Sequence, residues 1–134
     1  MLFAVTSKEL KILLPVILIG ICGTLEVDIH FLSLLDSLSI NYIIGVKPKD
    51  HQLLFDWVKA KGLKKHEFID NQGVEHNFEY YNQAPLNHAS FDYKVNFLSD
   101  TQTKPKGKKV KFSWVTSLEI TEDNLYKIMR AGRT

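Results

Sequence analysis

Two groups of basic residues carry the side chains whose type and spacing could do chemistry in this chain. Lys47, Lys49 and His51 directly follow a short run, residues 42–46, that is almost wholly apolar. Such a run is typical of a strand covered on both faces, as in a parallel sheet. In open α/β sheets, ligands bind at the carboxyl ends of these strands. The three residues could therefore contact a phosphate backbone, and the alternative is a solvated loop.

The second group is a lysine cluster on a segment that contains Pro105 and Gly107. Its members are Lys104, Lys106, Lys108, Lys109 and Lys111. At the tip of a hairpin they would bind DNA phosphates through counterion release, without reading the base sequence. The alternative is a solubilising loop that protects a strand edge from pairing with another chain. The sequence leaves both interpretations open.

Several other kinds of chemistry lack the residues they need. The five histidines, at positions 30, 51, 66, 76 and 88, do not have the spacing of a zinc site. No glycine-rich loop ends in the Lys-Ser/Thr pair that binds nucleotide phosphates. Cys22 is the single cysteine and has no base placed beside it, so the sequence favours a buried thiol over a nucleophile. One cysteine also excludes an internal disulfide and fits the cytoplasm.

The elements that must position these residues begin with a parallel βαβ unit. The apolar runs at 16–20 and 42–46 are joined by residues 26–38, which have helical periodicity. The predicted apolar stripe of that helix is Val27, Phe31, Leu34, Leu35 and Leu38. A second helix follows, with Asp50 as N-cap and Gly62 just past its end. Its predicted buried face is Leu53, Leu54, Trp57 and Val58.

After residue 65 the hydrophobic period changes to two, which predicts antiparallel strands. Residues 91–98 and 110–120 alternate, with Trp114 on the apolar side, and a loop at 100–109 joins them into a long hairpin. A turn at 71–73 predicts a second hairpin within 66–86. A last helix is capped by Thr121, with Leu125, Ile128 and Met129 as its apolar face. Arg130 and Arg133 near its end join the candidate DNA contacts.

Length and composition limit the alternatives. A chain of 134 residues forms one domain, and a net charge of +2 is too small to indicate nucleic acid unless the charge is clustered. The uncharged run at 12–25 is too short to span a bilayer, so we expect no membrane association. It could act as an export signal, although Glu9, Pro15 and the bulky Ile21 before Cys22 argue against that.

Several ordered segments resemble the DDE transposases of bacterial insertion sequences, in the group whose RNase H-like core carries a β-strand insertion. The matching segments are NYIIGVKPKDHQLLF (41–55), FEYYN (78–82), VNFL (95–98), FSWVT (112–116), EITE (119–122) and MRAGR (129–133). The resemblance implies an α/β (α+β) fold in three parts. Residues 1–65 would form part of the RNase H-like βαβα core, residues 66–120 an antiparallel β insertion, and residues 121–134 the start of a returning helix.

The resemblance also implies that this chain does not catalyse the family's reaction. Those enzymes cleave and rejoin DNA with three carboxylates that hold Mg²⁺ ions. The first Asp of the family would precede Met1, and the catalytic Glu would lie beyond Arg133. The second Asp is expected near Ile21, where no acidic residue stands, and Glu26 and Asp28 belong to the following helix. We therefore expect a fragment truncated at both ends, with no catalytic residue, metal site or cofactor.

Three functional hypotheses follow from the sequence. The first is an inactive transposase remnant that binds DNA weakly and without sequence preference. The second is a non-enzymatic DNA-binding or regulatory module, which could associate with itself or with a full-length transposase. The third is a small exported α+β protein, if residues 12–25 act as a signal.

Overall fold

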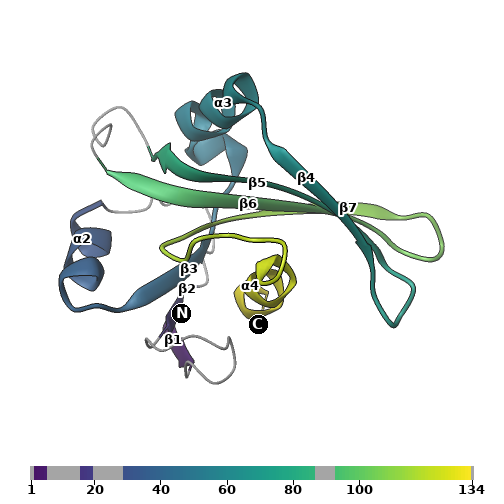
Figure 1. Cartoon of the computed structure of the whole chain (residues 1–134), viewed down its shortest axis with the longest axis horizontal. Coiled ribbons are helices and arrows are strands. Elements are labelled where there is room, and N and C mark those ends of the chain that lie inside the picture. The colour runs from purple at the N-terminus through teal and green to yellow at the C-terminus, as the bar shows by residue number, and fades with distance from the viewer. Residues whose placement is uncertain (1, 6–15, 20–28, 87–92, 134) are drawn as a thin grey trace.

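The computed structural model of the chain describes residues 2–5, 16–19, 29–86 and 93–133, with side chains placed from residue 29 onward (Figure 1). Within these residues the strands form one seven-stranded mixed sheet in the order β1-β2-β3-β7-β6-β5-β4. The strands are β1 (Leu2–Val5), β2 (Val16–Ile19), β3 (Asn41–Gly45), β4 (Lys64–Ile69), β5 (Glu75–Pro85), β6 (Lys94–Thr103) and β7 (Lys109–Thr116). The five strands from β3 to β4 in this order pair antiparallel, so the fold is α+β.

The predicted parallel βαβ unit is confirmed. Strands β2 and β3 pair in parallel, and α2 (Ile29–Ser37) connects them. Tyr42, Ile43 and Ile44 of β3 are each only 1% exposed, because this strand is covered on both faces of the sheet. That burial explains why the sequence of β3 is apolar at successive positions rather than at alternate ones.

The predicted apolar stripe of α2 is wrong in most of its members. Phe31, Leu34 and Leu38 are 37%, 52% and 58% exposed, whereas Leu32 and Leu35 are buried against β3. Val27 falls outside the described residues. Both choices of stripe follow a helical spacing, and a helix this rich in apolar residues does not show by periodicity alone which side faces the sheet.

The segment after β3 begins with a 3₁₀ turn rather than with the predicted cap. Pro48–Asp50 forms η1, and α3 (Gln52–Lys61) starts two residues later, so Asp50 is not its N-cap. Proline fixes the backbone angle that opens such a turn, which shifts the start of the helix. Leu54 and Val58 are buried as predicted, while Leu53 and Trp57 are half-buried. Gly62, with φ of 93°, ends the helix as expected.

The two predicted hairpins are confirmed with different boundaries. Strand β6 continues to Thr103, so the loop predicted at 100–109 is reduced to a tight turn in which the Lys104 and Gly107 amides donate to Lys108 and Lys104 carbonyls. Strand β7 ends at Thr116 although the alternation runs on to Ile120. There the Leu118 amide donates to Oγ1 of Thr116, and this local bond replaces the ladder. Phe91 and Asp92 lie outside the described residues.

The last helix, α4 (Leu125–Gly132), buries its predicted face. Leu125, Ile128 and Met129 are 1%, 1% and 3% exposed and pack with Trp114 on one face of the sheet. Its N-cap is Asn124 rather than Thr121, because a turn precedes the helix. In this turn Oδ1 of Asn124 accepts a hydrogen bond from the Thr121 amide.

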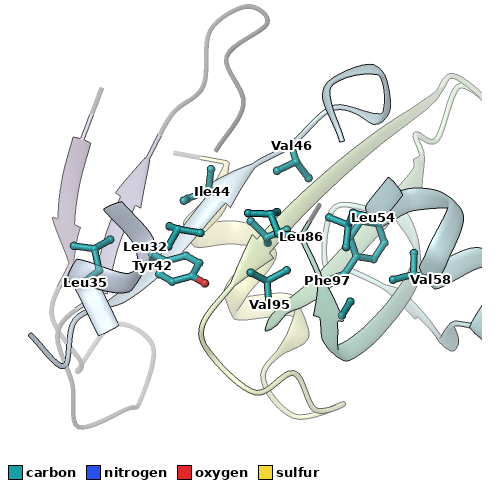
Figure 2. Close-up of a cluster of buried hydrophobic side chains, with 12 residues drawn as sticks. Leu32, Leu35, Tyr42, Ile44, Val46, Leu54, Val58, Leu86, Val95 and Phe97 are labelled. Carbon is teal, nitrogen blue, oxygen red and sulfur yellow. The ribbon is translucent and has the colours of Figure 1, made fainter. Parts of the chain in front are cut away.

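Helices α2 and α3 cover the opposite face of the sheet. Their buried leucines and valine pack with β3, β6 and Leu86 in a second core cluster (Figure 2). Beyond both cores the β4–β5 and β6–β7 hairpins extend away from α2 at the other end of the sheet (Figure 1). The sheet therefore has an inner half covered on both faces and an outer half, which we call the free half, on which α4 packs against one face only.

Candidate nucleic-acid interface

The lysines of the β6–β7 turn lie at the end of the free half of the sheet. Lys104, Lys106, Lys108, Lys109 and Lys111 are all exposed. Strand β7 pairs with β3 through residues 114–116, and the Ser113 carbonyl accepts from the Val46 amide, so within the described chain only the part of β7 before Ser113 has β6 as its single neighbouring strand. Lys109 and Lys111 belong to this outer part of β7.

A first pocket, which we call the edge pocket, lies where β3 ends beside β7. It has a volume of about 500 Å³ and is lined by Val46, Lys47 and Pro48 on one side and by residues 111–114 and Arg133 on the other. The sheet explains this proximity, because the Val46 amide donates to the Ser113 carbonyl over 3.0 Å. The edge pocket thus brings together Lys47, Lys111 and Arg133 from three separate elements.

A second pocket, the helix pocket, lies between α4 and the outer hairpins. Its volume is about 600 Å³, and Lys104, Arg130 and Arg133 contribute its cationic side chains. Phe68 of β4 and Tyr126 of α4 also line it, with ring centroids 4.9 Å apart. Arg133 lines both pockets, and we call the five cationic residues of the two linings the basic strip: Lys47, Lys104, Lys111, Arg130 and Arg133.

Arg133 is held in place by two contacts. Its Nη1 donates to Oε1 of Gln102 over 3.1 Å, and its guanidinium carbon lies 4.3 Å from the ring centroid of Phe112. A stacked guanidinium keeps free N–H groups at its edge, which suits it for phosphate. Arg130 is exposed, and its guanidinium carbon lies 5.9 Å from the ring centroid of Tyr126.

The residues expected beside Lys47 are separated by the structure. Lys49 is exposed in η1 but does not line either pocket. His51 is 3% exposed, so its ring cannot present a surface to DNA, and we remove it from the candidate contacts. The 3₁₀ turn is the cause, because it directs the chain inward at His51 before α3 begins.

The sequence missed a buried network beneath the helix pocket. Nδ1 of His76 lies 2.7 Å from Oδ2 of Asp100, and Nε2 lies 2.8 Å from Oδ2 of Asp70. Both nitrogens can donate at once only when the imidazole is protonated. The bond from His76, with backbone amides of Val74 and Gln72, lowers the pKa of Asp70 despite its partial burial.

Strand alternation gives only part of the signal for this network, namely which residues of each strand share a face. Residues 76, 78 and 80 share one face of β5, and residues 98, 100 and 102 share the same face of β6. His76, Asp100 and Gln102 are the polar members of this buried face, beside Phe78, Tyr80 and Leu98. Gln102 links the network to the basic strip, because Nε2 donates to Oδ2 of Asp100 while Oε1 accepts from Arg133.

The acidic side chains of the described residues lie apart from one another or are separated by other groups. Within those residues, three or more His, Cys, Asp or Glu side chains do not converge anywhere in a way that could hold an ion. Asp70 and Asp100 are separated by the His76 ring. Cys22, Glu26 and Asp28 fall outside the described part of the chain.

Comparison with known proteins gives no relative. No protein family, no curated protein and no solved structure matches this chain. In the described part, no helix has the length and apolar character needed to cross a membrane.

Proposed function

We propose that this chain is a non-catalytic DNA-binding protein related to the DDE transposases, which holds the phosphate backbone along the basic strip. The resemblance of six ordered segments supports the family, and the parallel β2–α2–β3 unit agrees with part of an RNase H-like core. We also propose that the βαβα part of the chain is a partial RNase H-like core. The absence of acidic residues near Ile21 supports the lack of catalysis.

The single observation that carries the proposal is the position of Arg133. It joins Lys47 and Lys111 of the edge pocket to Lys104 and Arg130 of the helix pocket. Clustered cations on a chain of modest net charge are the electrostatic footprint of nucleic-acid binding. Lys106, Lys108 and Lys109 continue the positive charge onto the hairpin tip.

The binding expected from this surface is weak and independent of sequence. Lysine and arginine contacts to phosphates carry no base information, so the dissociation constant should be on the order of 10⁻⁴–10⁻⁶ M at physiological salt. The alternative is a regulatory module that associates with a full-length transposase. Such a module would also bind DNA phosphates through the basic strip.

The test compares two variants that remove equal charge. The strip variant carries Lys47→Gln, Lys111→Gln and Arg130→Gln, and the control variant carries Lys59→Gln, Lys65→Gln and Lys94→Gln at exposed positions outside both pockets. Fluorescence anisotropy with two duplexes of unrelated sequence should show about tenfold or greater weakening for the strip variant only. Equal weakening by both variants would mean that net charge, rather than the strip, governs binding.

A further inference from the structure

The β4–β5 turn, which forms one wall of the helix pocket, is closed by two backbone hydrogen bonds, from the Asp70 amide to the Val74 carbonyl and from the Gly73 amide to the Asp70 carbonyl. The side chain of Asp70 adds further bonds to it. Asp70 begins the β4–β5 turn, and its Oδ1 accepts hydrogen bonds from the amides of Gln72 and Val74 over 2.8 and 3.1 Å. Its Oδ2 faces Nε2 of His76. These bonds position the turn, and four residues of the turn line the pocket: Asp70, Asn71, Gln72 and Val74.

The two carboxylates of the network differ in their freedom to move. Asp100 is 0% exposed, and its Oδ2 already accepts from Gln102 as well as facing His76. Within the described residues, Oδ1 of Asp100 has no hydrogen-bond partner. The Asp70 side chain is 13% exposed and lies in a surface turn. Asp70 can therefore turn towards water, and Asp100 cannot.

The surroundings of His76 also include three aromatic rings and the cations that line the helix pocket. Phe68 of β4 and Phe78 of β5 flank the ring, and Tyr126 of α4 meets it edge-to-face at 5.3 Å between centroids. Lys104, Arg130 and Arg133 line the pocket above and oppose a positive imidazole. The two carboxylates lie at hydrogen-bond distance from the two ring nitrogens, and each can accept one N–H from the ring when both nitrogens carry a proton.

We propose that His76 is a proton-operated latch for the β4–β5 turn, which fastens that wall of the helix pocket when the imidazole is protonated and releases it when the proton is lost. A neutral ring keeps one N–H. Buried Asp100 retains that N–H at Nδ1, because leaving an uncompensated carboxylate inside the protein is costly. The lone pair of Nε2 then faces the carboxylate of Asp70, and Asp70 turns to water.

Release of Asp70 has two consequences. The amides of Gln72 and Val74 lose their side-chain acceptor, so the turn becomes more mobile. An unneutralised carboxylate is also exposed beside the cations of the basic strip. This second consequence rests on the proposed function, whereas the first does not depend on any ligand.

The test is amide hydrogen exchange of the purified chain at several pH values, corrected for the intrinsic pH dependence of exchange. Between about pH 5.5 and 8.5, where histidine loses its proton, protection of the Gln72 and Val74 amides should fall about tenfold. Gly107 is the internal reference, because its amide donates to the carbonyl of Lys104 in the neighbouring turn. Its corrected protection should stay constant.

Three variants separate the latch from general effects of pH. His76→Gln cannot titrate, so protection of the turn should be low and constant. Asp70→Asn should also remove the pH dependence, and it decides the matter if the buried His76 variant does not fold. His66→Gln changes a more exposed histidine, 3.8 Å from Glu122, and should behave as the unmodified chain. Constant protection in the unmodified chain, or a retained pH dependence in Asp70→Asn, would overturn the proposal.

A DNA-binding measurement distinguishes failure of the latch from failure of the proposed DNA binding. Duplex affinity of the unmodified chain should fall further between about pH 6 and 8 than that of Asp70→Asn, because only the former uncovers a carboxylate. If no DNA binds at any pH while the turn still loosens, the latch stands and the DNA proposal fails. If DNA binds and the turn does not respond to pH, the latch fails alone.

Discussion

The side chain of Arg133 is positioned by a few specific contacts. Its guanidinium stacks on Phe112 and bonds to Gln102, and Gln102 in turn bonds to a carboxylate that is fully buried. A lysine at this position could neither stack as a planar group nor donate from a fixed fork. The position of Arg133 therefore depends on the interior of the outer sheet as well as on its surface.

Gly132, the neighbour of Arg133, is required by the close approach of α4 to β7. A Cβ at this position would lie 2.6 Å from Nε1 of Trp114 and 3.0 Å from Cγ2 of Ile43. Both neighbours are buried, so neither can move away easily. We predict that Gly132→Ala lowers the free energy of unfolding by about 1–3 kcal/mol through overpacking.

Chemical denaturation measures this change, and Gly45→Ala is the matched control. A Cβ at Gly45 would meet nothing within 4 Å, and that substitution should leave stability within about 1 kcal/mol of the unmodified chain. If Gly132→Ala is as stable as Gly45→Ala, α4 does not pack on Trp114 as described.

At the scale of elements, the sequence predicts α4 well and α2 poorly for the same physical reason. Helix α4 alternates charged and apolar residues, so only one choice of buried face is available, and Leu125, Ile128 and Met129 occupy it. Helix α2 has apolar residues on several sides. Its orientation is decided by contact with β3, which no local pattern encodes.

Strand register limits prediction of the buried network in a similar way. The hairpins follow from alternation and turn residues, but pairing of His76 with Asp100 requires knowing which residues of β5 lie beside which of β6. The irregularity between Tyr81 and Ala84 shifts that register by an amount that is not visible in the sequence. The lysines of the hairpin tip needed no register, because their exposure follows from their position in a turn.

The corrected face of α2 leads to a prediction about two leucines two residues apart. Leu32 is 0% exposed and Leu34 is 52% exposed. Leu32→Ala should cost about 2–5 kcal/mol, since it removes buried methyl groups and leaves a cavity, whereas Leu34→Ala should change stability by less than about 0.5 kcal/mol. Urea unfolding of both variants measures the difference. Equal costs, or a larger cost for Leu34→Ala, would restore the face expected from the sequence.

At the scale of the whole molecule, the two pockets and the hairpin tip place most of the candidate DNA contacts on the outer half of the sheet. The half of the sheet with α2, α3 and the parallel strands supplies one core cluster but few of these contacts, and α4 packs the other core cluster against Phe78, Leu98 and Trp114. His51 was expected on the surface from the sequence, but the structure buries it in the inner, covered half, so it is not a candidate DNA contact.

We also predict that the purified chain does not cleave DNA. Purified chain with Mg²⁺ or Mn²⁺ should leave a supercoiled plasmid intact, because two-metal catalysis needs clustered carboxylates that the described residues do not provide. Gel electrophoresis after incubation measures this. Metal-dependent nicking that is abolished by changing Glu26 or Asp28 would show that those residues act as ligands and that the chain is an enzyme.

The salt dependence of duplex binding tests the basic strip most directly. Each phosphate contact contributes a slope of about −0.9 to log K against log salt, so four contacts predict roughly −3.5 for the unmodified chain. The strip variant should flatten that slope to about −1, and the control variant with the same net charge should keep it. Equal slopes for the unmodified chain and the strip variant, or a salt-independent affinity, would contradict the assignment of DNA binding to this surface.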